Sequence, residues 1–453
     1  MINNRCLKIA AISLGCAKNR IDSEEYLGYL ASKGHIITDD REWADLVLIN
    51  TCAFIEKAQQ ESINTILEEA SSRRERKPLL VATGCLPQLE GRSLLAKLPE
   101  LDGAIGVHSY KEIDHLVKQI AGGRRCFHCR PPGDSYNALF SRLRTTAPHS
   151  ADVKIAEGCD NRCAYCLIPR IRGSYRSRPP GEITAEIEQL LQGGAREISL
   201  IAQDTTAYGT DRQEYGDLAA LVRRILSTDR HFWLRIMYTY PSRITAGLLD
   251  LMNEDQRLLK YIDLPIQHAS SPILQAMRRS YNRPDLEQLI GGMRRKVPGI
   301  TLRTTVMVGF PGERRRSFDN LTLFLKQFPF ERLGAFTYSN QDGTDAYKYH
   351  PQVPHRVKER RLKELMETQK EIAAALNKKL IGKRVTILVD RAGERGKGWH
   401  LGRTAGQAPE VDGSVYFRSP RSIPAGSFAK VTITAAGAYN YLGTDPEPVE
   451  DRG

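Results

Sequence analysis

The stretch EGCDNRCAYC, residues 157–166, decides the fold of the centre of this chain. It places Cys159, Cys163 and Cys166 on one short loop, directly after the apolar run Val153–Ala156, which predicts a strand. A structural zinc site has four protein ligands, and no fourth Cys or His stands at a suitable spacing nearby. Three thiolates suit a four-iron cluster with one iron left open for a small molecule. The spacing therefore favours an iron–sulfur site over three buried structural cysteines.

Outward from this loop, apolar runs alternate with amphipathic stretches. Six runs predict strands: Val153–Ala156, Glu197–Ala202, Phe232–Tyr238, Tyr261–Ile266, Thr301–Val308 and Leu333–Tyr338. The stretches between them have the length of crossover helices: Ile183–Leu191, Leu218–Leu226, Leu286–Val297 and Phe318–Phe328. This alternation predicts an α/β fold with a partial, open (β/α)6 barrel.

Polar residues follow several of these predicted strands, where the chemistry of such barrels sits. Gln203 and Asp204 follow the second run, Gln267 and His268 the fourth, and residues 309–313 the fifth. Gln203 is the better candidate for a cofactor contact. The sequence leaves open whether His268 is a site residue or an ordinary loop or core histidine.

The N-terminal region predicts a second α/β unit, an open parallel sheet. The apolar runs Leu7–Leu14, Leu46–Asn50 and Leu79–Thr83 are typical of buried parallel strands, and helical patterns separate them. A cysteine stands at or just after the end of each run: Cys16, Cys52 and Cys85. Because the carboxyl ends of parallel strands line one crevice, we expect these thiols to converge on a second cluster. The alternative is three small buried residues, each following a strand.

These motifs resemble a known family. The three-cysteine loop, with Tyr165 before its last cysteine, is similar to the signature of radical S-adenosylmethionine enzymes. Residues 14–24 (LGCAKNRIDSE), 50–55 (NTCAFI) and 83–88 (TGCLPQ) closely resemble the N-terminal domain of methylthiotransferases. The motifs KIAEGC, IPRIRG and IAQDT, at residues 154–159, 168–173 and 201–205, favour the branch that modifies an aspartate of small-subunit ribosomal protein twelve. The resemblance runs from about Lys8 to Leu442; Ala17, where proline is common, departs from it without replacing a ligand.

The resemblance implies a radical transferase with S-adenosylmethionine and two 4Fe–4S clusters. Cys159, Cys163 and Cys166 would hold the cluster that cleaves S-adenosylmethionine, and Cys16, Cys52 and Cys85 the cluster that carries the sulfur. The resulting radical removes hydrogen from the β-carbon of the aspartate, and a methylthio group is delivered there. Tyr165, Gln203 and Asp204 are expected at the bound S-adenosylmethionine. The alternative is the same chemistry on tRNA adenosine.

The C-terminal part predicts a helix over Arg356–Lys379 and then a small antiparallel β-barrel. Its β-like segments are Val385–Val389, Trp399–Thr404, Val415–Arg418 and Ala429–Ala435. They resemble a TRAM domain, which generally binds RNA and in this branch is implied to help hold the protein substrate. Its arginines suit either partner: Arg384, Arg391, Arg403, Arg418 and Arg421.

The composition of the 453 residues, with 41% hydrophobic and 26% charged residues, is that of a globular protein, and the net charge of +13 favours anionic partners. No apolar run approaches the roughly 18 residues of a membrane span, and nine cysteines without an export signal favour reduced thiols, so we expect a cytoplasmic protein without membrane contact.

Cys126 and Cys129 are interpreted as an incidental exposed pair in a linker. We expect domains at 6–121, 151–378 and 379–445, a linker at 122–150 and a tail at 446–453. The expected partners are the ribosomal protein or its subunit and an electron donor such as a flavodoxin or ferredoxin; the chain itself is expected to be a monomer.

Overall fold

The computed structural model describes residues 6–72, 78–133, 142–393 and 398–449. The chain divides into two compact units. The first comprises residues 1–145, 156–177 and 339–347, and the second comprises residues 146–155, 178–338 and 348–453. The three-cysteine loop therefore belongs to the same compact unit as the N-terminal sheet.

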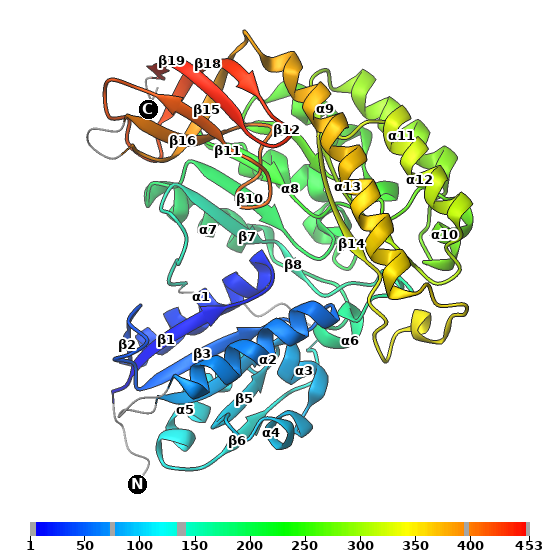
Figure 1. Cartoon of the computed structure of the whole chain (residues 1–453). Coiled ribbons are helices and arrows are strands. Elements are labelled where there is room, and N and C mark those ends of the chain that lie inside the picture. Colours follow the sequence, from blue (N-terminus) through cyan, green and yellow to red (C-terminus); the bar gives the residue numbers. More distant parts are fainter. Residues whose placement is uncertain (1–5, 73–77, 134–141, 394–397, 450–453) are drawn as a thin grey trace. The chain divides into compact units, whose positions relative to one another are not determined.

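The first unit is built on a six-stranded sheet in the order β2-β1-β3-β4-β5-β6, with all neighbouring strands parallel (Figure 1). Its strands are β1 (Lys8–Ser13), β2 (Ile36–Ile37), β3 (Leu46–Thr51), β4 (Leu79–Gly84), β5 (Gly103–Gly106) and β6 (Cys126–His128). The three predicted strands correspond to β1, β3 and β4. The predicted open parallel sheet is confirmed.

Helices cover both faces of this sheet. They are α1 (Ala17–Ser32), α2 (Glu56–Ser71), α3 (Cys85–Glu90), α4 (Ser93–Lys97) and α5 (Ile113–Ala121). Alternate residues of β3 point to opposite sides: Leu46 and Leu48 pack with α1 and α5, and Val47 and Ile49 pack with α2, α3 and α4. Both faces are buried, which explains why the strands are continuous apolar runs rather than alternating ones.

Strand β6 was not expected from the sequence. Cys126–His128 lie in the predicted linker but pair in parallel with β5, and both Cys126 and Cys129 are partly buried. The segment is too short and too polar at its ends to be predicted as a strand, and only its place at the edge of the sheet makes it one. The description of these cysteines as an exposed pair is therefore wrong.

The second unit contains a six-stranded parallel sheet in the order β7-β10-β11-β12-β13-β14. Its strands are β7 (Ser150–Lys154), β10 (Glu197–Ile201), β11 (Trp233–Ile236), β12 (Leu258–Asp263), β13 (Thr301–Val308) and β14 (Arg332–Thr337). Each predicted run overlaps one strand of this sheet, and β7 and β14 are edges that do not pair with one another. The open six-stranded barrel is confirmed.

The crossover helices of this barrel overlap the predicted amphipathic stretches, and two more, α9 and α10, were not expected. In chain order they are α7 (Pro180–Gln192), α8 (Leu218–Ile225), α9 (Ala246–Glu254), α10 (Ser271–Ala276), α11 (Arg283–Lys296) and α12 (Arg315–Gln327). Helix α13 (His355–Asn377) is the predicted connector to the C-terminal barrel. No helix in the described part of the chain combines the length and the apolar character needed to cross a membrane.

The C-terminal strands form a closed barrel in the order β15-β16-β17-β19-β18. They are β15 (Arg384–Arg391), β16 (Trp399–Thr404), β17 (Val415–Arg418), β18 (Phe428–Ala436) and β19 (Tyr441–Pro448). The pairs are antiparallel except β17 with β19, which is parallel and closes the barrel. Strand β19 was not expected, because Gly443, Asp445 and its prolines weaken the pattern; it ends three residues beyond the predicted end of this domain at residue 445.

A buried ion network joins this small barrel to the larger one within the second unit. Arg403 on β16 lies 2.7 Å from Glu197 and 2.9 Å from Asp390, and Glu197 also lies 2.8 Å from Arg235 on β11. Arg403 is only 4% exposed. Its expected place on a binding surface is therefore wrong: its charge is used inside the protein.

Candidate functional site

Cys16, Cys52 and Cys85 follow three adjacent parallel strands of the first unit, β1, β3 and β4. Helix α1, after β1, and helix α2, after β3, pack on opposite faces of the sheet, so the chain reverses its winding direction between these strands. In open α/β sheets, ligands bind at such a switch point, outside the carboxyl ends of the strands. Cys16 is also the N-cap of α1, where the positive end of the helix dipole favours an anionic sulfur.

Two glycines bring these cysteines close together. Gly15 has φ +88°, and a Cβ there would lie 2.7 Å from Cys52 Cβ and 3.0 Å from Cys52 Sγ. Gly84, with φ +92°, precedes Cys85 and lies so close to Asn50 that a Cβ would be 2.1 Å from its Oδ1. A side chain at either position would displace a neighbour, so the bare backbone is what allows the strand ends to approach.

The thiols of this set are largely buried and influence one another. Cys52 is 9% exposed and Cys85 is 6% exposed. Burial raises the pKa of the Cys85 thiol to about 12; Arg172 opposes this, and the other two thiols add to it. Burial likewise raises the pKa of Cys52. The geometry agrees: Cys85 Sγ lies 3.6 Å from Asn19 Oδ1, and Asn19 is anchored to the ends of β1 and β3, which precede Cys16 and Cys52.

The second set of cysteines lies on the loop that precedes α6 (Ile168–Arg172). The Cys159 N–H donates to Gly173 O (3.0 Å), and the Ile168 N–H points at Cys166 Sγ (3.4 Å). Gly158 at φ +80° passes so close to Ser174 that a Cβ would lie 2.0 Å from its carbonyl oxygen. These contacts fold the loop back on itself, and Tyr165 within it is 8% exposed.

Helix α6 anchors this loop in the N-terminal core. Leu167 and Ile171, each 1% exposed, belong to the same apolar cluster as Cys85 and Leu86. Arg172 ends the helix and is 2% exposed. The apolar side of α6 therefore fixes the cysteine loop to the face of the sheet that carries α2, α3 and α4.

Arg172 connects the two sets of cysteines, and the sequence alone did not single it out. Its Nη1 donates to both carboxylate oxygens of Glu157 at 3.0 Å, and its Nη2 lies 2.8 Å from Asp22 Oδ2 and 3.6 Å from Cys85 Sγ. Burial opposes the charge, but Asp22 and Glu157 raise the pKa of Arg172 above its ordinary value. The signal available in the sequence was an arginine and two carboxylates inside motifs that carry cysteines.

Asn19 completes this connection with its side-chain amide. Its Nδ2 donates to Leu14 O (3.1 Å) and Thr51 O (3.0 Å), at the ends of β1 and β3. Its Oδ1 accepts from Arg172 Nη2 at 2.7 Å. One buried amide thus holds together two strand ends and the arginine of α6.

The arrangement fits two iron–sulfur clusters better than single metal ions. Across the described residues, no three His, Cys, Asp or Glu side chains are placed to ligate one metal ion. A four-iron cluster binds each thiolate to a different iron, so its ligands need not meet at one point. The glycine that lets the β1 end pass close to Cys52, and the buried cation beside Cys85, suit a group held by anionic sulfurs.

The residues predicted at the ends of the barrel strands belong to the second unit. Asp204 is 2% exposed; its Oδ2 lies 2.6 Å from Arg243, and its Oδ1 accepts from Thr206 at 2.6 Å. Asp204 is thus an ion-paired residue that holds the loop after β10. Gln203 beside it is partly exposed.

His268 has the environment of a core histidine. It is fully buried, and its Nδ1 accepts from the backbone N–H groups of Ala269 and Ser270, each at 2.9 Å. Its Nε2 lies 3.4 Å from Glu313, which itself pairs with Arg361 at 2.7 Å. These contacts link the loops after β12 and β13, so the structure favours a structural role for His268.

Comparison with known proteins identifies the family. The uncharacterized protein family UPF0004 matches residues 8–106, the radical SAM superfamily matches residues 153–325, and the TRAM domain matches residues 381–444. The protein named ribosomal protein uS12 methylthiotransferase RimO from Desulforudis audaxviator is 44% identical over 96% of this chain and 96% of its own length. Its namesake from Geobacter sulfurreducens is 39% identical over 98% and 99%. The chain belongs to the RimO family.

Solved structures support the fold of this RimO family member. The radical S-adenosylmethionine methyltransferase TsrM from Kitasatospora setae, solved with cobalamin and a 4Fe–4S cluster bound, has a TM-score of 0.55 at 14% identity, covering 74% of this chain and 72% of its own. The cobalamin-dependent radical enzyme OxsB has a TM-score of 0.51 at 11% identity, covering 80% of this chain and 56% of its own. At these identities the likeness concerns the fold alone.

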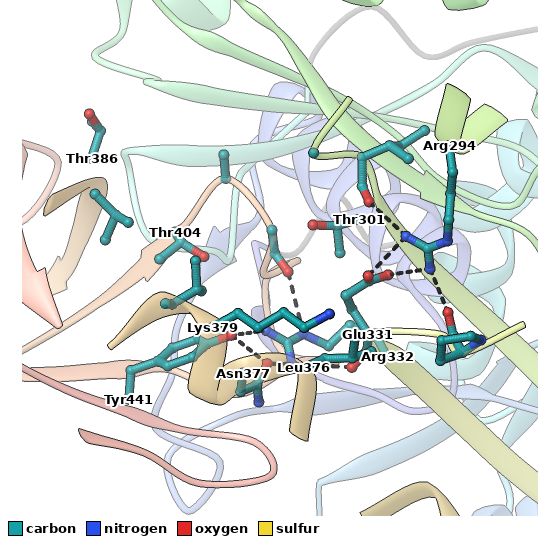
Figure 2. Close-up of a pocket in the computed structure, with 17 residues that line it drawn as sticks. Arg294, Thr301, Glu331, Arg332, Leu376, Asn377, Lys379, Thr386, Thr404 and Tyr441 are labelled. Atoms are coloured by element: carbon teal, nitrogen blue, oxygen red, sulfur yellow. Dashed lines mark hydrogen bonds and ion pairs between the residues drawn. The ribbon is translucent and has the colours of Figure 1, made fainter. Parts of the chain in front are cut away.

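A groove in the second unit lies away from the predicted cofactor end of the barrel. It has a volume of about 760 Å³, and Figure 2 shows its polar residues, among them Thr301, Arg332, Asn377 and Tyr441. Thr301 and Arg332 begin β13 and β14, so the groove lies at the amino ends of the strands. Catalysis in such barrels takes place at the carboxyl ends, and we assign this groove to the junction between the barrel and the TRAM domain.

The TRAM domain of this RimO family member presents a mixed aromatic and basic face, named here the TRAM face. It consists of Trp399, Tyr416, Arg418 and Leu442 on the neighbouring strands β16, β17 and β19. Trp399 and Tyr416 are each 40% exposed, and the Arg418 guanidinium lies 4.6 Å from the centre of the Trp399 ring. An exposed group of this composition is typical of macromolecular recognition.

Proposed function

We propose that this chain inserts a methylthio group at the β-carbon of an aspartate in ribosomal protein uS12. The similarity to RimO proteins over nearly the whole length supports this function. The single observation that carries it in the structure is the presence of two three-cysteine sets in one compact unit. Methylthio transfer needs two such sites, whereas a single-cluster radical enzyme needs only one.

We propose that Cys159, Cys163 and Cys166 hold the cluster that works with S-adenosylmethionine, and that Cys16, Cys52 and Cys85 hold the second. When bound, these cofactors supply the electron and radical that open the carbon–hydrogen bond, and the sulfur and methyl group that replace the hydrogen. The protein holds its own parts in place: α6 fixes the first loop to the core, and Asn19 holds the strand ends.

We propose further residues that contact S-adenosylmethionine in each of the two units. In the first unit we propose Tyr165, a buried residue of the cysteine loop. In the second unit we propose Gln203, with Asp204 acting through its ion pair with Arg243 to fix the loop. Each assignment rests on the family motifs and on the position of these residues at a loop end.

We propose three domains with cores at 6–121, 151–378 and 379–445; β6 of the 122–150 segment completes the first sheet, and β19 carries the third domain to Pro448, within the expected tail of 446–453. The three family matches lie within these limits. We also propose that the chain is a cytoplasmic monomer that receives electrons from a flavodoxin or ferredoxin. The cysteines proposed as cluster ligands form no disulfides, and their need to stay reduced is consistent with a reducing compartment.

The test is intact mass spectrometry of ribosomal proteins from cells with and without this protein, with nucleoside analysis of tRNA from the same cultures. We expect uS12 alone to lose the mass of a methylthio group in the absence of the protein. A change confined to tRNA would instead assign the chain to the adenosine-modifying branch. Unchanged uS12 and unchanged tRNA would contradict both assignments.

A further inference from the structure

The Arg172 guanidinium contacts groups of both cysteine sets. Arg172 is almost completely buried, and a buried guanidinium is costly unless anionic or polar groups surround it. Two carboxylates, of Asp22 and Glu157, contact this one cation. Both carboxylates offset the cost of burying this guanidinium.

The Cys85 sulfur is the third anionic partner when it carries a metal. Arg172 Nη2 lies 3.6 Å from Cys85 Sγ, within hydrogen-bond range for sulfur. A neutral thiol accepts hydrogen bonds weakly, whereas a cysteine bound to iron is a thiolate and accepts them well. The contact therefore gains strength in the form of the protein that holds a cluster.

The same arginine is fixed to the other cysteine loop. Arg172 is the last residue of α6, six residues after Cys166, and Glu157 stands two residues before Cys159. The hydrogen bonds from Arg172 Nη1 to both carboxylate oxygens of Glu157 therefore close the loop that carries Cys159, Cys163 and Cys166. Any displacement of this loop would change the distance from the guanidinium to Cys85.

We propose that Arg172 is a positioning residue for the second cluster: its guanidinium hydrogen-bonds the Cys85 sulfur, and its charge raises the reduction potential of that cluster. The reduction potential of an iron–sulfur cluster depends on net charge and on hydrogen bonds to its sulfurs, and a nearby cation stabilises the more negative, reduced state. The inference rests on the proposed function through the assignment of Cys16, Cys52 and Cys85 as ligands.

The experiment isolates the second cluster in the full chain. Replacing Cys159, Cys163 and Cys166 with alanine removes the other cluster, and an anaerobic redox titration followed by electron paramagnetic resonance then reports one centre. In this background we expect Arg172→Gln to lower the ratio of reduced to oxidised cluster at least tenfold at a fixed potential. For a one-electron couple this is a shift of about 59 mV to more negative potential.

A variant that removes a negative charge distinguishes an electrostatic effect on the potential from a general distortion of the site. Asp22→Asn removes a negative charge from the same group and should move the potential in the positive direction. Arg172→Lys keeps the charge and should restore most of the potential lost in Arg172→Gln. A merely structural role would make the Asp22 and Arg172 variants shift the potential in the same direction, which would overturn the inference.

Arg125→Gln is the matched control. Arg125 donates to the carbonyl oxygens of Leu95, Leu98 and Leu101, just before β6 and thus at the edge of the sheet opposite the strand ends that carry the cysteines. Its loss should leave the potential unchanged. If Arg172→Gln does not assemble a cluster, the reduction potential of Asp22→Asn tests the inference instead. An unchanged potential in Asp22→Asn would overturn it. A triple alanine background without any cluster overturns the ligand assignment itself, and the inference with it.

Discussion

At the scale of single residues, the position of Cys52 depends on the missing side chain of Gly15. Gly15 occupies a left-handed backbone conformation in contact with Cys52, whereas Gly34 has nearly the same φ, +89°, and a Cβ there would have nothing within 4 Å. The two positions share the strain that an alanine would introduce and differ only in the cysteine contact. They therefore form a matched pair.

Gly15→Ala should reduce the iron content by about half, because the new methyl group occupies the position beside Cys52 Sγ while the other three-cysteine loop is untouched. Gly34→Ala should cost about 1–2 kcal/mol of stability from backbone strain and retain full iron. Iron and sulfide analysis of the reconstituted proteins, together with thermal unfolding, distinguishes them. Full iron in Gly15→Ala would mean that the second cluster does not lie beside Cys52.

At the scale of elements, α6 is a five-residue helix too short to be stable alone, so its place depends on packing. Ile171 provides much of that packing, since it is 1% exposed within the core cluster. The helix carries Arg172 at one end and follows Cys166 at the other. Loss of core packing should thus affect both stability and the cysteine loop.

Ile171→Ala should lower the free energy of unfolding by about 2–5 kcal/mol through lost burial and a new cavity. Because the loop is fixed through the same helix, S-adenosylmethionine cleavage should also fall. Leu67→Ala is the control, since Leu67 on α2 is 40% exposed and its loss should change stability by no more than about 0.5 kcal/mol. Denaturant unfolding and a cleavage assay measure the two effects; a stable, active Ile171→Ala protein would contradict this role.

The TRAM face is the second element, and we expect it to bind the ribosomal substrate. Arg418→Ala should raise the KM for the ribosomal substrate about tenfold, equal to about 1.4 kcal/mol of binding, because it removes the charge stacked on Trp399. Cleavage of S-adenosylmethionine without substrate should not change. Arg384→Ala, which removes an exposed arginine paired with Glu447 outside this face, is the control. Equal effects of the two variants would argue against a specific face.

At the scale of the whole molecule, the ion network of Glu197, Arg235 and Arg403 makes the barrel and the TRAM domain of the second unit one structural body. Glu197 is fully buried, and burial opposes its charge, but Arg403 and Arg235 outweigh this and hold the pKa of Glu197 below its ordinary value. A carboxylate with a lowered pKa stabilises the folded state above its unfolded-state pKa. That contribution is lost as the pH falls through the lower folded-state value.

Glu197→Gln should therefore destabilise the protein by about 3–5 kcal/mol at neutral pH, since it leaves two buried arginines short of a carboxylate. The difference from the unchanged protein should stay constant from about pH 7 to about pH 5 and shrink below about pH 4.3. Glu188→Gln, at an exposed pair with Arg230, should cost no more than about 1 kcal/mol. Unfolding measured across this pH range checks both, and a pH-independent difference would contradict the electrostatic explanation.

Strand and helix periodicity and ligand spacing are local properties of the chain, so the amino-acid sequence was enough to predict the fold class, the two sets of three cysteines and the order of the domains. Only the folded chain shows which charges are used inside the protein. Arg403 lies in a basic C-terminal segment yet is buried against Glu197, and Arg172 lies 153 residues from Asn19 yet bonds it. These ion pairs and hydrogen bonds, and the position of β6 at the edge of its sheet, depend on which elements pack together. Local sequence patterns do not predict that packing.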